Sequence, residues 1–157
     1  MNARAPELAF VALGGAGEIG MNLNLYGYGP APDGHQWLMV DLGVTFGDGS
    51  IPGIDVIMAD PSFIEARRGR LLGLVLTHAH EDHLGAVPYL WERLRCPIWA
   101  TPFTVSILTR KLREAGLDGQ VPIQTVPLGG RITKVVPSRA PLKASTLPAS
   151  RTSILTF

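Results

Sequence analysis

The sequence feature that most constrains the fold is an apolar strand that ends in a run of metal-ligand residues. Residues 71–77 (LLGLVLT) are almost continuously apolar, which is typical of an interior strand buried on both faces. The next residues read His78-Ala79-His80-Glu81-Asp82-His83 and hold three of the four histidines of the chain. We therefore expect a sheet in which this strand delivers a histidine cluster to one edge.

The spacing within this hexad allows four potential ligands to converge. Side chains two residues apart in an extended segment point to the same side, so His78 and His80 face one way. Asp82 and His83 fall where the chain turns into a predicted helix. Imidazole and carboxylate are accepted as ligands by zinc, manganese and iron, and such a metal lowers the pKa of a bound water. The hexad thus predicts a hydrolytic metal site, and a solvated loop with clustered histidines is the alternative.

The fourth histidine, His35, lies in a turn and is predicted to be solvated and without a role.

Hydrophobic periodicity predicts a meander of strands followed by strands that alternate with helices. Strands are expected at residues 8–13, 21–28, 36–41, 71–77, 96–100 and 121–127. Helices are expected at residues 61–68, at residues 84–94 with a break near Pro88, and at residues 101–115. This order indicates an α/β or α+β sandwich with the helices packed outside the sheet.

Charge divides the chain near Gly130. Residues 1–130 carry 9 Lys or Arg and 13 Asp or Glu, whereas residues 131–157 carry 5 basic residues and no acidic one. The second segment is also rich in Ser, Thr and Pro and contains none of the 18 glycines. We therefore expect a partial domain over residues 1–130, followed by an atypical basic tail that is disordered or results from a frameshift. An RNA-contacting arm is the alternative, although the only aromatic residue of the tail is Phe157.

Composition narrows the class of protein. With 157 residues, of which 46% are hydrophobic and 17% charged, the chain is long enough for one domain with a buried core. The single cysteine, Cys96, cannot form an intramolecular disulfide. The apolar run at residues 8–13 is too short for a signal peptide or a spanning helix. We expect a cytoplasmic protein without a membrane segment.

Four segments of the chain, one of which contains the hexad, carry a resemblance to a known family. They are FVALGGAGEIGMN (residues 10–22), VDLG (40–43), PGID (52–55) and LTHAHEDHLGAVPYL (76–90). Together they resemble the ribonuclease J family, in the β-CASP nuclease branch of the metallo-β-lactamase fold. The resemblance implies the N-terminal, incomplete portion of an αββα sandwich. It also implies a zinc-dependent hydrolase that cuts RNA phosphodiesters as a 5′-to-3′ exonuclease and endonuclease, and that forms homo-oligomers in some full-length members.

The resemblance also assigns roles to residues in these motifs. It implies that His78 and His80 bind one zinc ion and that Asp82 and His83 bind a second, with manganese as an alternative metal. Asp82 and His83 are then the catalytic pair, and Asp82 also orients the bridging hydroxide. Asp41, at the end of its predicted strand, matches a buried aspartate that supports the ligands from behind. From the sequence alone, capping of local backbone N–H groups is an equal alternative for Asp41.

Part of the implied site is missing. A complete site of this family needs a further histidine and a bridging aspartate after residue 130, yet residues 131–157 contain no His, Asp or Glu. We therefore expect reduced zinc affinity and weak or absent hydrolysis. Two alternatives stay open: a hydrolase of the same fold that acts on thioesters, lactones or β-lactams, and a non-catalytic fragment.

A glycine motif offers a competing interpretation. Residues 15–20 (GAGEIG) match the dinucleotide-binding pattern G-x-G-x-x-G and follow a predicted strand. That motif requires a helix that begins in the glycine loop and holds the pyrophosphate at its N-terminus. Here the next residues, 21–28, alternate with the period of a strand. We interpret these glycines as a tight turn between strands, near the metal site.

Overall fold

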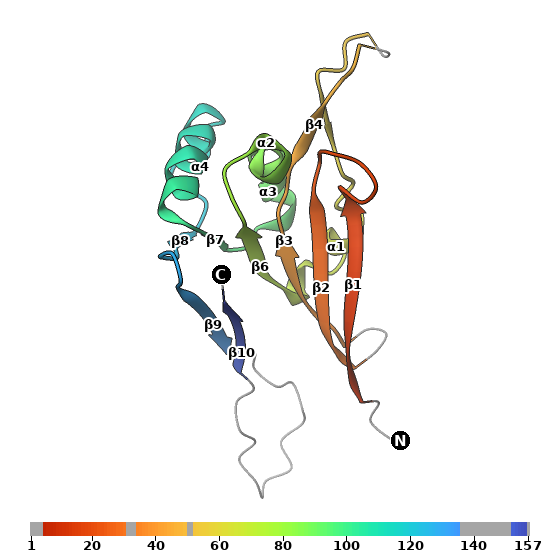
Figure 1. Ribbon diagram of the computed structural model, residues 1–157, viewed down its shortest axis with the longest axis vertical. Helices are drawn as coiled ribbons and strands as arrows, with labels where there is room; N and C mark the ends of the chain where they lie inside the picture. Colours follow the sequence, from red (N-terminus) through yellow and green to blue (C-terminus); the bar gives the residue numbers. More distant parts are fainter. Residues whose placement is uncertain (1–4, 31–33, 50–51, 136–151, 157) are drawn as a thin grey trace, which may run out of the picture. The chain divides into compact units, whose positions relative to one another are not determined.

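The computed structural model describes residues 5–30, 34–49, 52–135 and 152–156 (Figure 1). It consists of two compact units, Met1–Thr125 and Val126–Phe157. The predicted boundary near residue 130 falls close to the start of the second unit. Much of the predicted disordered or frameshifted tail, residues 136–151 and 157, lies outside the described residues.

The first unit is built on a six-stranded sheet with the order β1-β2-β3-β6-β7-β8. These strands are β1 (Pro6–Gly14), β2 (Leu23–Pro30), β3 (Gln36–Val40), β6 (Leu71–Leu76), β7 (Ile98–Ala100) and β8 (Ile123–Thr125). The first three pair antiparallel, which confirms the predicted meander. From β3 onward the pairs are parallel, so each later strand needs a crossover connection. Figure 1 shows β1, β2, β3 and β6 running side by side.

Helices form these crossovers. They are α1 (Ser62–Glu65), a 3₁₀ turn (Arg68–Arg70), α2 (Glu81–Leu84), α3 (Val87–Leu94) and α4 (Pro102–Glu114). Pro88 lies in the first turn of α3, where a missing N–H costs nothing, so the predicted break falls just before it. Because β3, β6, β7 and β8 follow one another along the sheet, right-handed crossovers place all of these helices on the same face.

The hydrophobic core lies between this helical layer and the sheet. Leu25 of β2, Met39 of β3 and Ile98 of β7 are completely buried, and they belong to one cluster with residues of all four α-helices. The side chains that contribute to the cluster from the helices include Ile64, Leu84, Val87, Leu90, Leu94, Leu108 and Leu112. One α-layer on one β-layer is half of an αββα sandwich, so the predicted fold class is confirmed for the described residues.

The opposite face of the sheet is apolar but exposed. Along β1 and β2 it presents Leu8, Phe10, Tyr26 and Tyr28, which are 74%, 58%, 43% and 48% exposed. The register pairs Leu8 with Tyr28 and Phe10 with Tyr26, and the rings of Phe10 and Tyr26 lie 5.1 Å apart. In an αββα sandwich, a second sheet packs against this type of face.

Two small sheets were not predicted from the sequence. In the first unit, β4 (Val44–Phe46) pairs antiparallel with β5 (Val56–Met58). In the second unit, β9 (Arg131–Val135) pairs antiparallel with β10 (Thr152–Thr156). Strands of three residues are too short to show a periodicity of their own, which explains why the first pair escaped prediction.

No helix in the described segments has the length and the apolar content that a membrane span requires.

Candidate metal centre

The histidines of the hexad meet just beyond the carboxyl end of β6. The ring centroids of His78 and His80 lie 4.6 Å apart, and those of His78 and His83 lie 4.0 Å apart. The first two are brought together by the extended segment after β6, as predicted. His83 joins them because α2 begins at Glu81 and turns the chain back toward the strand end.

Asp41 is a buried residue that contacts this cluster. It follows β3, is 4% exposed, and has a φ of +63°, a left-handed conformation that aspartate tolerates better than most residues. Its Oδ1 accepts a hydrogen bond from the backbone N–H of Thr77 at 2.8 Å, and its Oδ2 lies 2.8 Å from Nδ1 of His83. Asp41 thus contacts His83 and also caps the backbone N–H of Thr77, so it makes the contacts that both of the roles left open by the sequence require.

Asp41 and Thr77 place a hydrogen on Nδ1 of two histidines. The carboxylate of Asp41 accepts from Nδ1 of His83, and Nε2 of the same ring faces Oδ2 of Asp82 at 3.2 Å. The hydroxyl of Thr77 donates to Asp41 Oδ2 at 2.9 Å and lies 2.9 Å from Nδ1 of His78. Since its hydrogen is directed to Asp41, the hydroxyl oxygen accepts from Nδ1 of His78. The lone pair of the neutral His78 ring is then on Nε2, which faces Nδ1 of His80 at 3.1 Å.

Burial favours the neutral form of His78. It is the largest of the effects that lower the pKa of this imidazole from 6.5, and the neighbouring His83 and His80 lower it further. A lowered pKa favours the neutral ring at neutral pH, and neutral imidazole is the form that binds metal.

Asp82 completes the donor set, although the side chains contact one another. Oδ2 of Asp82 lies 3.2 Å from Nε2 of His83, and Nε2 of His78 lies 3.1 Å from Nδ1 of His80. Among the described residues, no three His, Cys, Asp or Glu side chains have the arrangement that holds a metal ion. The donor types fit zinc, because three imidazoles and a carboxylate are within contact distance. Side-chain rotation has to replace these mutual contacts by ligand contacts.

Glu81 faces away from the cluster and pairs with α4. Its Oε1 lies 2.6 Å from Nζ of Lys111. Gly85, the C-cap of α2, packs tightly against the same residue, since a Cβ at this position would lie 2.7 Å from Glu81 Oε2. The ion pair thus joins α2, which carries Asp82 and His83, to α4.

The glycine loop between β1 and β2 contains no helix. Residues 15–20 form bends, and β1 and β2 are antiparallel, whereas a dinucleotide fold needs a parallel βαβ unit. The loop ends at Asn22, whose backbone N–H donates to the carbonyl oxygen of Asp82 at 3.0 Å. The glycines therefore do not form a dinucleotide motif, as predicted, but the connection over residues 15–22 is a loop of bends and longer than the predicted tight turn.

His35 was predicted wrongly. It is 5% exposed, its Nε2 lies 3.5 Å from Oε1 of Glu7, and its ring lies 5.4 Å from that of Trp37. The turn that precedes β3 folds this ring against the sheet, which a sequence window of glycines and prolines does not reveal.

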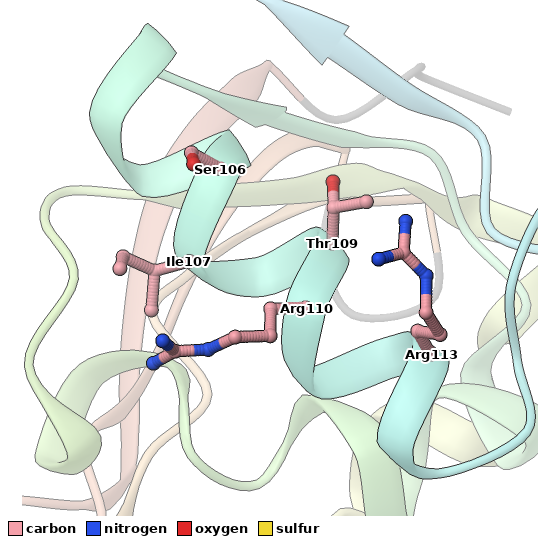
Figure 2. A pocket seen from close by; sticks show the side chains of 5 residues that line it. All are labelled: Ser106, Ile107, Thr109, Arg110 and Arg113. Atoms are coloured by element: carbon pink, nitrogen blue, oxygen red, sulfur yellow. The ribbon is translucent and has the colours of Figure 1, made fainter.

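The surface also has a hollow along α4, with a volume of about 400 Å³. Figure 2 shows the side chains that line it. Its lining residues are Ser106, Ile107, Thr109, Arg110 and Arg113. All five lie on one helix and none is a nucleophile held by a base, so the hollow adds no chemistry to the candidate site.

Comparison with known protein families identifies the superfamily of the chain. The family model described as the metallo-beta-lactamase superfamily matches residues 28–139. This range contains Asp41 and the whole hexad. The chain therefore belongs to the metallo-beta-lactamase superfamily.

Within this superfamily the chain is similar to ribonuclease J. It is 46% identical to ribonuclease J of Sinorhizobium meliloti over 130 residues, which cover 83% of this chain and 23% of that protein. It is 41% identical to ribonuclease J of Corynebacterium glutamicum, over 71% of this chain and 15% of the relative. For ribonuclease J of Helicobacter pylori the identity is 33%, over 74% of this chain and 16% of the relative. The chain thus spans less than a quarter of the length of these relatives.

Among solved structures, the DIM-1 metallo-beta-lactamase matches 83% of this chain and 49% of its own, with 18% identity and a TM-score of 0.35.

Proposed function

We propose that this chain is the metal-ligand portion of a zinc-dependent ribonuclease that hydrolyses RNA phosphodiesters, as a 5′-to-3′ exonuclease and endonuclease. The observation that supports the proposal is the cluster of His78, His80, Asp82 and His83 beside the buried Asp41, which contacts His83 directly and His78 through Thr77. The similarity to ribonuclease J supplies the substrate class. The proposal includes a cytoplasmic location and, for the complete protein, a homo-oligomer.

Four residues would hold the metals: His78 and His80 one ion, and Asp82 and His83 the other. Zinc is the proposed ion, because imidazole-rich sites with a carboxylate suit it, and manganese is the alternative. When bound, divalent ions supply a water of lowered pKa and neutralise charge on the phosphate oxygens.

The residues of the chain prepare the site for this chemistry. Asp41 holds His83 directly and His78 through Thr77, so both rings are fixed at Nδ1 and their Nε2 atoms face Asp82 and His80. The Asp82 carboxylate, about one third exposed, lies beside His83 and can accept a proton or orient a water molecule. Asp82 and His83 are therefore the proposed catalytic pair.

A purified sample of the chain tests this proposal with zinc and a 5′-monophosphorylated RNA. We expect zinc binding in the metal-free protein and weak or undetectable cleavage, because the chain supplies only part of the donor set. The variant His83→Ala is the control, and it should lose zinc affinity. Equal zinc affinity in the variant and the parent would contradict the assigned ligands. Efficient cleavage by the chain alone would contradict the expectation that the chain supplies only part of the donor set.

A non-catalytic fragment is the second candidate, and one observation favours it. The ring nitrogens of the cluster contact one another and Asp82, without the arrangement that holds a metal among the described residues. Absence of zinc binding in a calorimetric titration would support this candidate over the nuclease. A chromogenic thioester or β-lactam assay distinguishes other hydrolases of the superfamily.

A further inference from the structure

The backbone of the ligand segment is held by two other parts of the chain. The carbonyl oxygen of Asp82 accepts two hydrogen bonds from Asn22, one from its backbone N–H and one from its side-chain Nδ2, both at 3.0 Å. The next carbonyl, that of His83, accepts from the backbone N–H of Leu42 at 2.7 Å. Both peptide groups that flank His83 are therefore fixed from outside the hexad.

The two hydrogen bonds to Asp82 have different consequences. A carbonyl oxygen has two lone pairs, and the backbone N–H of Asn22 already satisfies one of them. The side-chain amide satisfies the second, so the carbonyl is held in two directions and its peptide plane has little freedom to rotate. The direction of the Asp82 and His83 side chains depends on this plane.

Gly43 makes the approach possible. A Cβ at this position would lie 1.7 Å from the Asp82 carbonyl oxygen and 2.6 Å from the backbone nitrogen of His83. The backbone N–H of Gly43 donates to the carbonyl of Asn22 at 2.9 Å. Asn22, Gly43 and the Asp82 peptide thus pack in direct contact, and any side chain at position 43 would separate them.

The glycine loop places Asn22 for this role. Its last glycine, Gly20, has a φ of +124°, and a Cβ there would lie 2.5 Å from Cβ of Thr45. The following Met21 donates its N–H to the Val44 carbonyl at 3.0 Å. The loop therefore closes onto β4, and this closure brings Asn22 under the ligand segment.

We propose that Asn22 is a positioning residue of the metal centre, which orients Asp82 and His83 through the Asp82 carbonyl. This inference rests on the proposed metal site for its consequence, but its structural part stands on the hydrogen bonds alone. It gives the glycine motif a function, because the loop delivers an amide to the ligand backbone instead of holding a dinucleotide.

The test compares Asn22→Ala with Asn24→Ala, a control of the same chemistry two residues further along the chain, within β2. Zinc alone is titrated into each metal-free protein, and backbone amide exchange and thermal midpoints are measured. We expect the zinc dissociation constant of Asn22→Ala to rise about tenfold, as for residues that support metal ligands, with no change in Asn24→Ala. We also expect faster exchange at Leu42 and Gly43 in Asn22→Ala only.

The outcomes separate this inference from the proposed function. Equal zinc affinities in Asn22→Ala and the parent chain would overturn the positioning role, whatever the thermal midpoints. If the parent chain binds no zinc, the proposed metal site fails. The exchange data then decide whether Asn22 holds the Asp82 peptide group. Faster exchange at Leu42 and Gly43 in Asn22→Ala supports this role, and unchanged exchange overturns it. If Asn22→Ala does not fold, Asn22→Ser replaces it, because its shorter side chain removes the same contact.

Discussion

Asp41 and His83 are joined by a 2.8 Å contact between Oδ2 and Nδ1, although they lie 42 residues apart in the chain. Asp41 directly follows β3, and His83 lies beyond the end of β6, the neighbouring parallel strand in the sheet. The contact therefore depends on correct pairing of β3 with β6. It links the formation of the sheet to the geometry of the histidine cluster.

Replacing Asp41 by asparagine should weaken zinc binding about 10- to 100-fold, the usual loss when the support of a ligand histidine is removed. The amide has one acceptor oxygen in place of the two carboxylate oxygens, so it cannot serve both the Thr77 N–H and His83. Competition with a chromophoric chelator measures the change. Asp118→Asn, at an exposed carboxylate on the surface, is the matched control, and a similar loss there would contradict the assignment.

Thr77 should act on His78 through its hydroxyl. In Thr77→Val the shape is nearly unchanged, but the link from Asp41 to Nδ1 of His78 is lost. We expect a zinc dissociation constant about tenfold higher, whereas Thr77→Ser retains the hydroxyl and should restore the affinity of the parent chain. Equal affinities for the valine and serine variants would show that the hydroxyl does not hold the ring.

Most strands of the sheet and the clustering of the hexad histidines could be predicted from the sequence, because both depend on short-range patterns. The apolar run of β6 and the period-two alternation of β2 indicate strands directly, and the spacing of His78 and His80 places their rings together. The cluster lies at the strand end because the helix that follows begins within the hexad.

What the sequence could not reveal depends on contacts between distant segments. The hydrogen bonds from Asn22 to Asp82 span 60 residues, and no local pattern distinguishes Asn22 from Asn24. The burial of His35 against Trp37 is of the same kind. The resemblance could suggest Asp41 as a support, but only the pairing of β3 with β6 shows that it reaches both Thr77 and His83.

The origin of residues 131–157 stays a prediction. The family match extends to residue 139, and β9 occupies residues 131–135, so the composition change near residue 130 does not coincide with the end of either. Reading the coding DNA in all three frames beyond codon 131 tests the frameshift: a second frame that continues with a histidine motif and an aspartate would support it.

The ion pair between Glu81 and Lys111 should contribute little to stability despite its short distance. The Glu81 side chain is 41% exposed, and solvent-exposed pairs contribute about 0.2–1 kcal/mol. A double-mutant cycle with Glu81→Gln and Lys111→Met should give a coupling energy in this range that falls in high salt. The more exposed Arg113 and Asp118, 3.8 Å apart, provide the control and should couple less. A coupling well above this range would mean that the pair is effectively desolvated.

The two faces of the sheet should respond differently to the same substitution. Leu25 is completely buried under the helices, whereas Leu8, on the neighbouring strand, is 74% exposed on the opposite face. Leu25→Ala leaves a cavity in the core and should lower the free energy of unfolding by about 2–5 kcal/mol. Leu8→Ala should change it by less than about 0.5 kcal/mol, since little of its surface is removed from water on folding. Urea unfolding followed by circular dichroism measures both, and a large loss at Leu8 would mean that the exposed face is covered in solution.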